Sequence, residues 1–132
     1  MGGLDGMNYD CIVDDVPAIM ARLPQAVRAR HYTTSLVAGE VRDRESSQGL
    51  EFMLEAGLLE VRDPQASHPR IPRRLEARLS PADRSLLALA VELASECGSV
   101  AIATDDYALQ EAAVRLGLGV LKVRYRGARV TW

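Results

Sequence analysis

The sequence predicts an α/β fold, a three-layer α/β/α sandwich around a central, mostly parallel sheet. Short apolar runs, typical of buried strands, alternate along the chain with longer segments whose apolar residues have helical spacing. Because parallel strands are joined by helical crossovers, this alternation predicts helices on both faces of one sheet. The 132 residues, 48% of them apolar, suffice for one domain with a core and are too few for two.

The first half of the chain is predicted to contain three extended segments and three helices. In chain order they are a strand at 9–14, a helix opened by Pro17, an extended segment at 32–34, a helix that Ser35 caps and that carries Glu40 and Arg44, a helix at 49–56, and a strand at 58–62.

The second half begins with a loop at 63–72, where three prolines remove backbone donors. The run Ser80-Pro81-Ala82-Asp83 is typical of a helix start, with serine as the cap and proline in the first position, and this helix is expected to end near 97–98. A buried strand at 100–103, a helix opened by Thr104-Asp105-Asp106 and ending at Gly117, and a strand at 119–125 follow.

Composition limits the class of protein. The apolar runs are too short to cross a bilayer and the N-terminus lacks a secretion signal, so we expect a soluble, cytoplasmic protein with no membrane partner. Cys11 and Cys97 lie beside predicted buried segments without metal-ligand spacing, which predicts reduced core thiols and no zinc site. The net charge of −2 argues against binding of nucleic acid through a basic surface alone.

Acidic residues follow two of the predicted strands. Asp14 ends the first strand and the pair Asp105 and Asp106 ends the fourth, at the edge where parallel sheets bind ligands. Asp83 and Glu40 are expected in or near the first turns of helices that often begin at the same edge. Because clustered carboxylates repel one another, a shared pocket would require hard cations, Mg²⁺ or Mn²⁺, as cofactors.

Each acid also has a purely structural explanation. Asp83 suits the third position of a helix, Thr104 with Asp105 can cap the helix that follows, and Glu40 can pair with Arg44 at the i, i+4 spacing. The functional interpretation therefore depends on the whole set of acids and not on any one member.

Four ordered motifs resemble the PIN domain of the Nin-one-binding endonuclease family, and together they cover almost the whole chain. They are Ile12-Val13-Asp14; Tyr32-Thr33-Thr34 with Val37-Ala38-Gly39-Glu40-Val41-Arg42-Asp43; Leu79-Ser80-Pro81-Ala82-Asp83 with Leu87-Ala88-Leu89-Ala90; and Thr104-Asp105-Asp106-Tyr107-Ala108-Leu109-Gln110.

The resemblance implies an endoribonuclease that trims the 3′ end of precursor small-subunit ribosomal RNA with Mg²⁺ or Mn²⁺. It also implies a set of site residues: Asp14, Glu40, Asp83 and Asp106 as catalytic, metal-binding acids, Asp105 as a neighbour or fifth ligand, and Thr104 and Ser80 as supporting residues. The first motif departs from the family, because Asp15-Val16-Pro17 stands where small or hydroxyl residues usually follow the first aspartate. Asp15, or with less support Asp10, then becomes an alternative for part of the role of Asp14.

The resemblance describes residues 1–132 as a single PIN domain with a core at about 8–125, in which 126–132 form a C-terminal strand or tail. Family members usually continue from this point into a zinc ribbon with paired cysteines, which the sequence does not contain. Basic residues are then the candidates for phosphate contacts, although ordinary surface solvation explains them equally well: Arg70, Arg73, Arg74, Lys122, Arg124 and Arg126.

The expected activity is hydrolysis of single-stranded RNA by a monomer or homodimer whose partners are precursor ribosomal RNA and the pre-ribosomal particle. Two alternatives remain open. One is a toxin-type PIN ribonuclease of a toxin–antitoxin pair, which would share the acids. The other is a catalytically inactive PIN module that binds RNA, which the unusual Asp15-Val16-Pro17 segment alone supports.

Overall fold

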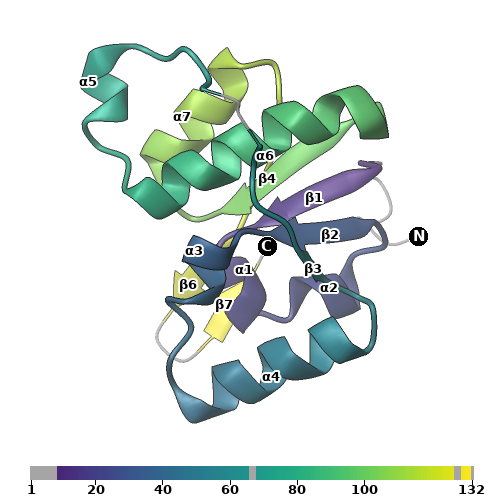
Figure 1. Ribbon diagram of the computed structural model, residues 1–132. Coiled ribbons are helices and arrows are strands. Elements are labelled where there is room, and N and C mark those ends of the chain that lie inside the picture. The colour runs from purple at the N-terminus through teal and green to yellow at the C-terminus, as the bar shows by residue number, and fades with distance from the viewer. Residues whose placement is uncertain (1–8, 66–67, 127–128, 132) are drawn as a thin grey trace.

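The computed structural model describes residues 9–65, 68–126 and 129–131, and from residue 125 onward it describes the backbone only. Its centre is a five-stranded sheet in the order β3-β2-β1-β4-β5, with every neighbouring pair parallel (Figure 1). The strands are β1 (Cys11–Asp14), β2 (Arg30–Thr33), β3 (Glu60–Val61), β4 (Val100–Thr104) and β5 (Gly119–Lys122). The predicted α/β sandwich is thereby confirmed.

The central strand β1 pairs with β2 on one side and with β4 on the other. Ile12 lies opposite His31 of β2, and Asp14 lies opposite Ala103 of β4. Because side chains alternate along a strand, Ile12 and Asp14 point to one face of the sheet, and Val13 points to the other. All five strands are parallel, so their carboxyl ends meet at one edge.

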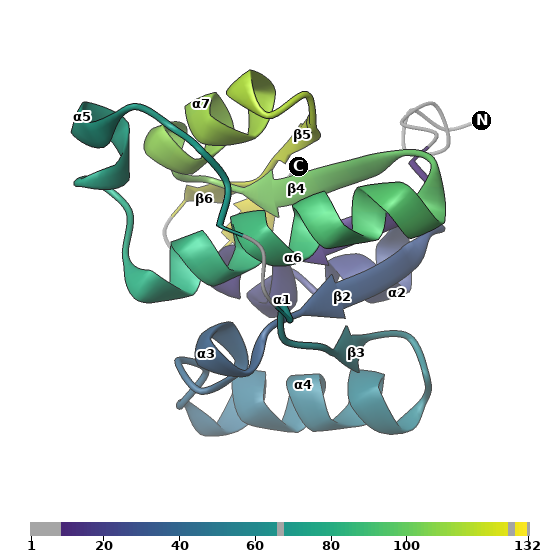
Figure 2. The ribbon, with the colours of Figure 1, turned by 45° about the horizontal axis from the view of Figure 1, so that its top comes forward.

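Helices cover both faces of the sheet (Figure 2). The helices α6 (Pro81–Cys97) and α7 (Tyr107–Arg115) pack on one face, where the larger apolar cluster includes Val13 and Ile102. The helices α1 (Val16–Met20) and α2 (Leu23–Ala26) lie on the other, where Ile12 packs in a smaller apolar cluster. We refer to these as the α6 face and the α1 face.

The segment after β2 differs from its prediction. The short helix α3 (Ser35–Ala38) ends before Glu40, and α4 (Arg44–Glu55) then begins behind Asp43, whose carboxylate accepts a hydrogen bond of 2.9 Å from the Ser46 amide. The prediction of one helix carrying both Glu40 and Arg44 was wrong, and the proposed i, i+4 pair with it. Asp43 is a strong helix cap, and it divides the segment at this point.

The start of α6 is confirmed, since Ser80 is its cap and Pro81 its first residue. The loop at 63–72 is also confirmed over its described residues, and α5 (Arg73–Glu76), which was not predicted, follows it. The single strand expected at 119–125 was wrong: β5 ends at Lys122, and β6 (Arg124–Arg126) pairs with β7 (Arg129–Thr131) in a separate antiparallel hairpin.

The two cysteines form a disulfide between the start of β1 and the last residue of α6, with 6.1 Å between their Cα atoms. The prediction of two reduced thiols was therefore wrong. The sequence showed that both residues belong to buried segments, but the register of α6 on the sheet decides that they meet. Within the described residues, no helix is long and apolar enough to span a membrane.

Candidate active site

The carboxyl edge of the sheet holds two polar residues that are adjacent across the β1–β4 pair. The Asp15 amide donates to the Ala103 carbonyl over 3.1 Å, so the parallel register continues one residue past the end of β1. Asp15 then lies beside Thr104, the last residue of β4. Because side chains alternate along β4, Thr104 points to the α6 face, as Ile102 does. The helices α6 and α7 both begin near this edge.

Asp15 is an unusual carboxylate because it is only 7% exposed. One of its oxygens caps α1 by accepting a hydrogen bond of 3.1 Å from the Ala18 amide, and the nearby Thr104 hydroxyl also favours the ionised carboxylate by lowering its pKa. Burial nevertheless raises the pKa of Asp15 to about 7, and the negative charges of Asp105 and Asp14 add to the rise. The ionised form of Asp15 is therefore under-stabilised, and a cation placed beside it would be favoured.

Asp14 points away from this edge, to the α1 face. Its Oδ2 lies 2.7 Å from Nδ1 of His31 in β2, and the other imidazole nitrogen, Nε2, lies 2.8 Å from the Val27 carbonyl. Both side chains are fully buried. Among the described residues no hydrogen-bond partner reaches Oδ1 of Asp14. The structure therefore does not bring Asp14 together with the other predicted acids, and its role as a metal ligand stays a prediction.

Asp14 and His31 determine each other's protonation. Burial raises the pKa of Asp14, against the attraction of the His31 imidazole. Burial also lowers the pKa of His31, but the charge and hydrogen bond of Asp14 outweigh this and leave it above its usual value. The pair consequently keeps a proton, shared between the Asp14 carboxylate and the His31 imidazole, to a higher pH than an isolated histidine would.

The end of β4 and the start of α7 form one hydrogen-bonded unit. Asp106 caps α7, since its Oδ1 accepts hydrogen bonds from the amides of Ala108 (2.8 Å) and Leu109 (3.4 Å). The Thr104 hydroxyl oxygen accepts from the Asp106 amide over 3.0 Å. Asp105 is exposed, whereas Asp106 is half-buried. The cap leaves Asp105 as the freer of the two carboxylates, next to Asp15.

Asp83 forms a capping box with Ser80 at the start of α6. Its Oδ2 accepts from the Ser80 amide over 3.0 Å, and its own amide donates to the Ser80 hydroxyl over 3.1 Å. The structural explanation of Asp83 is therefore confirmed, and its carboxylate is half-buried. Glu40 is exposed and follows α3.

A partly buried contact that sequence reasoning missed ties α3 to α6. The hydroxyls of Thr34, which caps α3, and Ser85 lie 2.7 Å apart. His31 was also missed, because nothing in the local sequence shows that it lies one strand away from Asp14. The only signal in the sequence was that His31 belongs to the short segment 30–33, the next extended segment after the strand that carries Asp14. Both contacts depend on strand and helix register.

A divalent cation fits part of this arrangement. In the described part of the chain no three acidic, histidine or cysteine side chains lie together in a way that could hold a metal ion, so the four predicted carboxylates are not gathered into one closed cage. Mg²⁺, however, is usually held by only one or two carboxylates with several waters and the substrate's phosphates. The interacting pair of Asp15 and Asp105, made of oxygen donors, meets that requirement.

The predicted RNA-binding residues fall in two places. Arg70, Arg73 and Arg74 are exposed around α5, and Arg74 also forms an ion pair of 3.4 Å with Glu111 of α7. Lys122, the last residue of β5, and Arg124, in β6, are exposed, and the side chain of Arg126 lies outside the described residues. The structure is thus compatible with phosphate contacts on both sides of the acidic edge.

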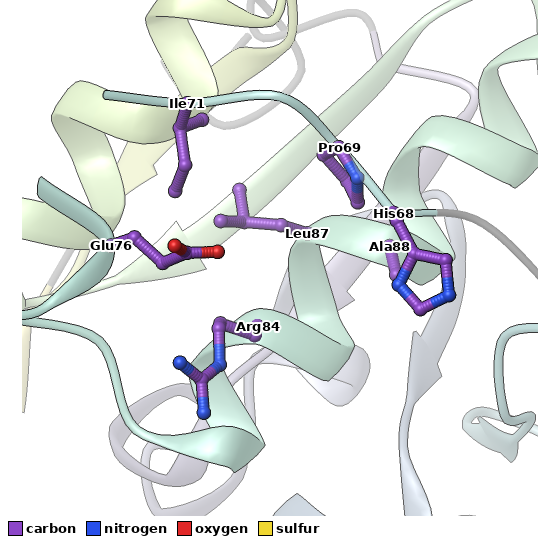
Figure 3. Close-up of a pocket in the computed structure, with 7 residues that line it drawn as sticks. All are labelled: His68, Pro69, Ile71, Glu76, Arg84, Leu87 and Ala88. Atoms are coloured by element: carbon purple, nitrogen blue, oxygen red, sulfur yellow. The ribbon is translucent and has the colours of Figure 1, made fainter. Parts of the chain in front are cut away.

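A cavity of about 230 Å³ lies between the 68–71 loop, α5 and α6 (Figure 3). Its floor is apolar, and Glu76 and Arg84 stand at its rim. Asp15, Asp105 and Asp106 do not line it. We therefore locate the candidate active site by the acids at the carboxyl edge and not by this cavity.

Comparison with known proteins places the chain among ribonucleases, although no protein-family model matches it. Ribonuclease VapC3 of Aeropyrum pernix is 44% identical over 132 residues, covering 96% of this chain and 95% of that protein. Endoribonuclease Nob1 of Methanothermobacter thermautotrophicus is 32% identical over 108 residues, covering 77% of this chain and 63% of Nob1. Nob1 of Pyrococcus abyssi is 36% identical over 100 residues, covering 71% and 59%. The chain thus spans about three fifths of the Nob1 proteins.

Proposed function

Because the chain belongs to the PIN-domain ribonucleases, we propose that it is a metal-dependent endoribonuclease that hydrolyses single-stranded RNA at the carboxyl edge of its sheet. One observation carries the proposal: the buried Asp15 carboxylate, with its pKa raised to about 7, lies beside Asp105 at the edge from which α7 begins. An acid tuned in this way at the ligand-binding edge of a parallel sheet is typical of functional sites.

In this proposal Asp15 and Asp105 hold Mg²⁺ or Mn²⁺, and Asp15 takes the place first assigned to Asp14. Bound there, the cation would favour ionisation of an attacking water and neutralise charge on the phosphodiester. Asp106, Asp83 and Glu40 are then the outer carboxylates of the site. In this proposal they contact the cation through water, in keeping with the hydration that Mg²⁺ retains.

The chain's own groups orient the reacting parts. Thr104 links the two halves of the site, because its hydroxyl oxygen accepts from the Asp106 amide and the same hydroxyl lowers the pKa of Asp15. The Gln110 amide donates to the Thr104 carbonyl over 3.2 Å and holds the end of β4 against α7. The amino-terminal ends of α6 and α7 add positive potential, which favours binding of a phosphate.

Within this activity, the substrate that the resemblance to the Nin-one-binding family implies is the 3′ end of precursor small-subunit ribosomal RNA. The motif Thr104-Asp105-Asp106-Tyr107 with Gln110 supports it. A free-standing ribonuclease of the toxin type is the second candidate, and it is favoured by the 44% identity to ribonuclease VapC3 over nearly its whole length. Both candidates act on unpaired RNA in this proposal, because the unstacked bases of a single strand can be splayed out and stacked on side chains beside the site.

Cleavage assays can test this proposal and separate the two candidates. Purified protein should cut a single-stranded RNA that spans the 3′ end of small-subunit RNA when Mn²⁺ or Mg²⁺ is present, and excess EDTA should abolish cutting. One cut at the mature end supports the maturation nuclease, whereas equal cutting of unrelated single-stranded RNAs supports the second candidate. Absence of metal-dependent cutting of any RNA would contradict the proposed activity altogether.

A further inference from the structure

The most exposed large hydrophobic side chain of the described residues lies beside the acids. Tyr107 is 78% exposed, it is the first residue of α7, and Asp106 immediately precedes it. The proposed chemistry assigns it no role, and no burial in the core explains an aromatic ring at this position. An exposed ring next to a phosphodiester-cleaving site is what an unpaired nucleobase can stack on.

The face of α7 that carries Tyr107 continues into a charged cluster. Residues 107, 111 and 115 follow one another at the i, i+4 spacing, so they lie along one side of the helix. Glu111 binds Arg115 over 3.2 Å, and it binds Arg74 of α5 over 3.4 Å. The Arg115 hydrogen bond and the Arg74 charge keep the pKa of Glu111 below its usual value, so this carboxylate stays ionised.

Glu111 therefore positions two guanidinium groups while neutralising only one of them. Both remain open to solvent, with 64% of the Arg74 and 44% of the Arg115 side chain exposed. The cluster keeps one net positive charge, and arginine has further donors that suit phosphate oxygens. Since 107 and 115 are eight residues apart, the ring and the cluster are separated by about 12 Å along the helix, a span of a few nucleotides.

We propose that this stripe, formed by Tyr107, Arg115 and Arg74, is a binding subsite for single-stranded RNA next to the cleavage site. Tyr107 stacks on an unpaired base beside the bond that is cut, and the two arginines bind phosphates further along the strand. The inference rests on the proposed RNA substrate, but it concerns binding and not the cleavage step. It also adds Tyr107 and Arg115 to the RNA-binding residues that the sequence predicted.

The test measures binding of a fluorescein-labelled 12-nucleotide single-stranded RNA of mixed sequence in EDTA, where no cleavage occurs. Tyr107→Ala should weaken binding by about 5- to 30-fold, the range expected for loss of one stacked base. Tyr107→Phe keeps the ring and should stay within about twofold of the wild type. Phe52→Ala is the matched control, since Phe52 is 52% exposed on α4, and Figure 2 shows α4 on the opposite side of the molecule from α7. It should not change binding.

A second arm localises the stacked base and the phosphate contacts. RNAs with one abasic nucleotide at successive positions should bind the wild type more weakly at one position, and at that position Tyr107→Ala should cause no further loss. Arg115→Ala should lower the slope of log affinity against log salt by about 0.7, whereas Arg44→Ala on α4 should not.

Equal binding by wild type and Tyr107→Ala would overturn the subsite, and so would a loss in Tyr107→Phe as large as that in Tyr107→Ala. A failure of the proposed function is separate, because it appears as absence of metal-dependent cleavage while these binding comparisons still give an answer.

Discussion

Two neighbouring carboxylates, Asp14 and Asp15, have opposite surroundings. Asp14 points to the α1 face and is bound by His31, whereas Asp15 points to the edge where α6 and α7 begin. The structural role of the first and the proposed catalytic role of the second follow from the alternation of side chains along β1. Each residue can therefore be tested separately by neutralising it.

Asp15→Asn should stabilise the metal-free protein at pH 8 by about 2 kcal/mol. This is a fraction of the free energy that corresponds to the pKa shift of Asp15. The folded protein has a pKa of about 7 at this carboxyl, against 3.8 in the reference state. Between these values the folded state binds more protons than the unfolded state, so stability falls as pH rises, and the loss is complete above pH 7. Asparagine keeps the cap of α1 without the charge.

Urea unfolding at pH 5 and pH 8 in EDTA measures this difference. Asp43→Asn provides the control, because Asp43 also caps a helix but its hydrogen bonds to Ser46 lower its pKa, so that its contribution is lost only as pH falls. An Asp15→Asn protein that is no more stable than the wild type at pH 8 would show that burial does not destabilise the ionised form of this carboxylate.

His31→Ala should destabilise the fold by about 3–5 kcal/mol, because it leaves the Asp14 carboxylate buried without a partner. The sequence contains one other histidine, His68, which is exposed at the rim of the cavity. His68→Ala is the matched control and should leave the unfolding midpoint in urea unchanged. Similar midpoints for the two variants would argue against a structural role for the Asp14–His31 pair.

The ends of helices were predicted correctly where they depend on residues that are neighbours in the sequence. Ser80 and Pro81 identified the start of α6 because capping depends on residues within one turn. The end of α3 at Ala38 was missed because the sequence around Glu40 is compatible with a helix. The helix does not continue because Asp43 caps a new helix, α4. Likewise β6 leaves the sheet to pair with β7, a choice between two partners that apolar content cannot settle.

Ser80→Ala should destabilise the protein by about 0.5–2 kcal/mol, because it removes the hydroxyl that accepts from the Asp83 amide. Ser95, an exposed serine near the other end of α6, bonds only back to the Glu92 carbonyl in the structure described. Ser95→Ala should be neutral or slightly stabilising, since alanine has the higher helix propensity. Thermal unfolding of both variants measures the difference, and equal melting temperatures would refute the contribution of the capping box.

At the scale of the whole molecule, the disulfide joins two elements that are 86 residues apart. Its formation places the start of β1 against the end of α6 and so fixes the helix that carries Asp83 to the strand that precedes Asp15. The candidate site was predictable as a set of acids at one edge of a sheet. Which of the acids meet there was not predictable, because it depends on registers between elements that are distant in the chain.

Reduction of the disulfide should lower the free energy of unfolding by about 4.5 kcal/mol, the value expected for a closed loop of this length. Urea unfolding with and without dithiothreitol measures the change. Cys97→Ser should have the stability of the reduced protein and should show no response to the reductant. A wild-type protein whose midpoint is insensitive to complete reduction would contradict a stabilising role for this bond.

The most direct test of the account is the response of three proteins to Mn²⁺: wild type, Asp15→Asn and Asp14→Asn. A cation that binds only the folded protein raises its melting temperature by mass action. We expect millimolar Mn²⁺ to raise the melting temperatures of the wild type and of Asp14→Asn by similar amounts, and to leave that of Asp15→Asn almost unchanged. An undiminished rise in Asp15→Asn, with none in Asp14→Asn, would contradict the assignment of the site to Asp15.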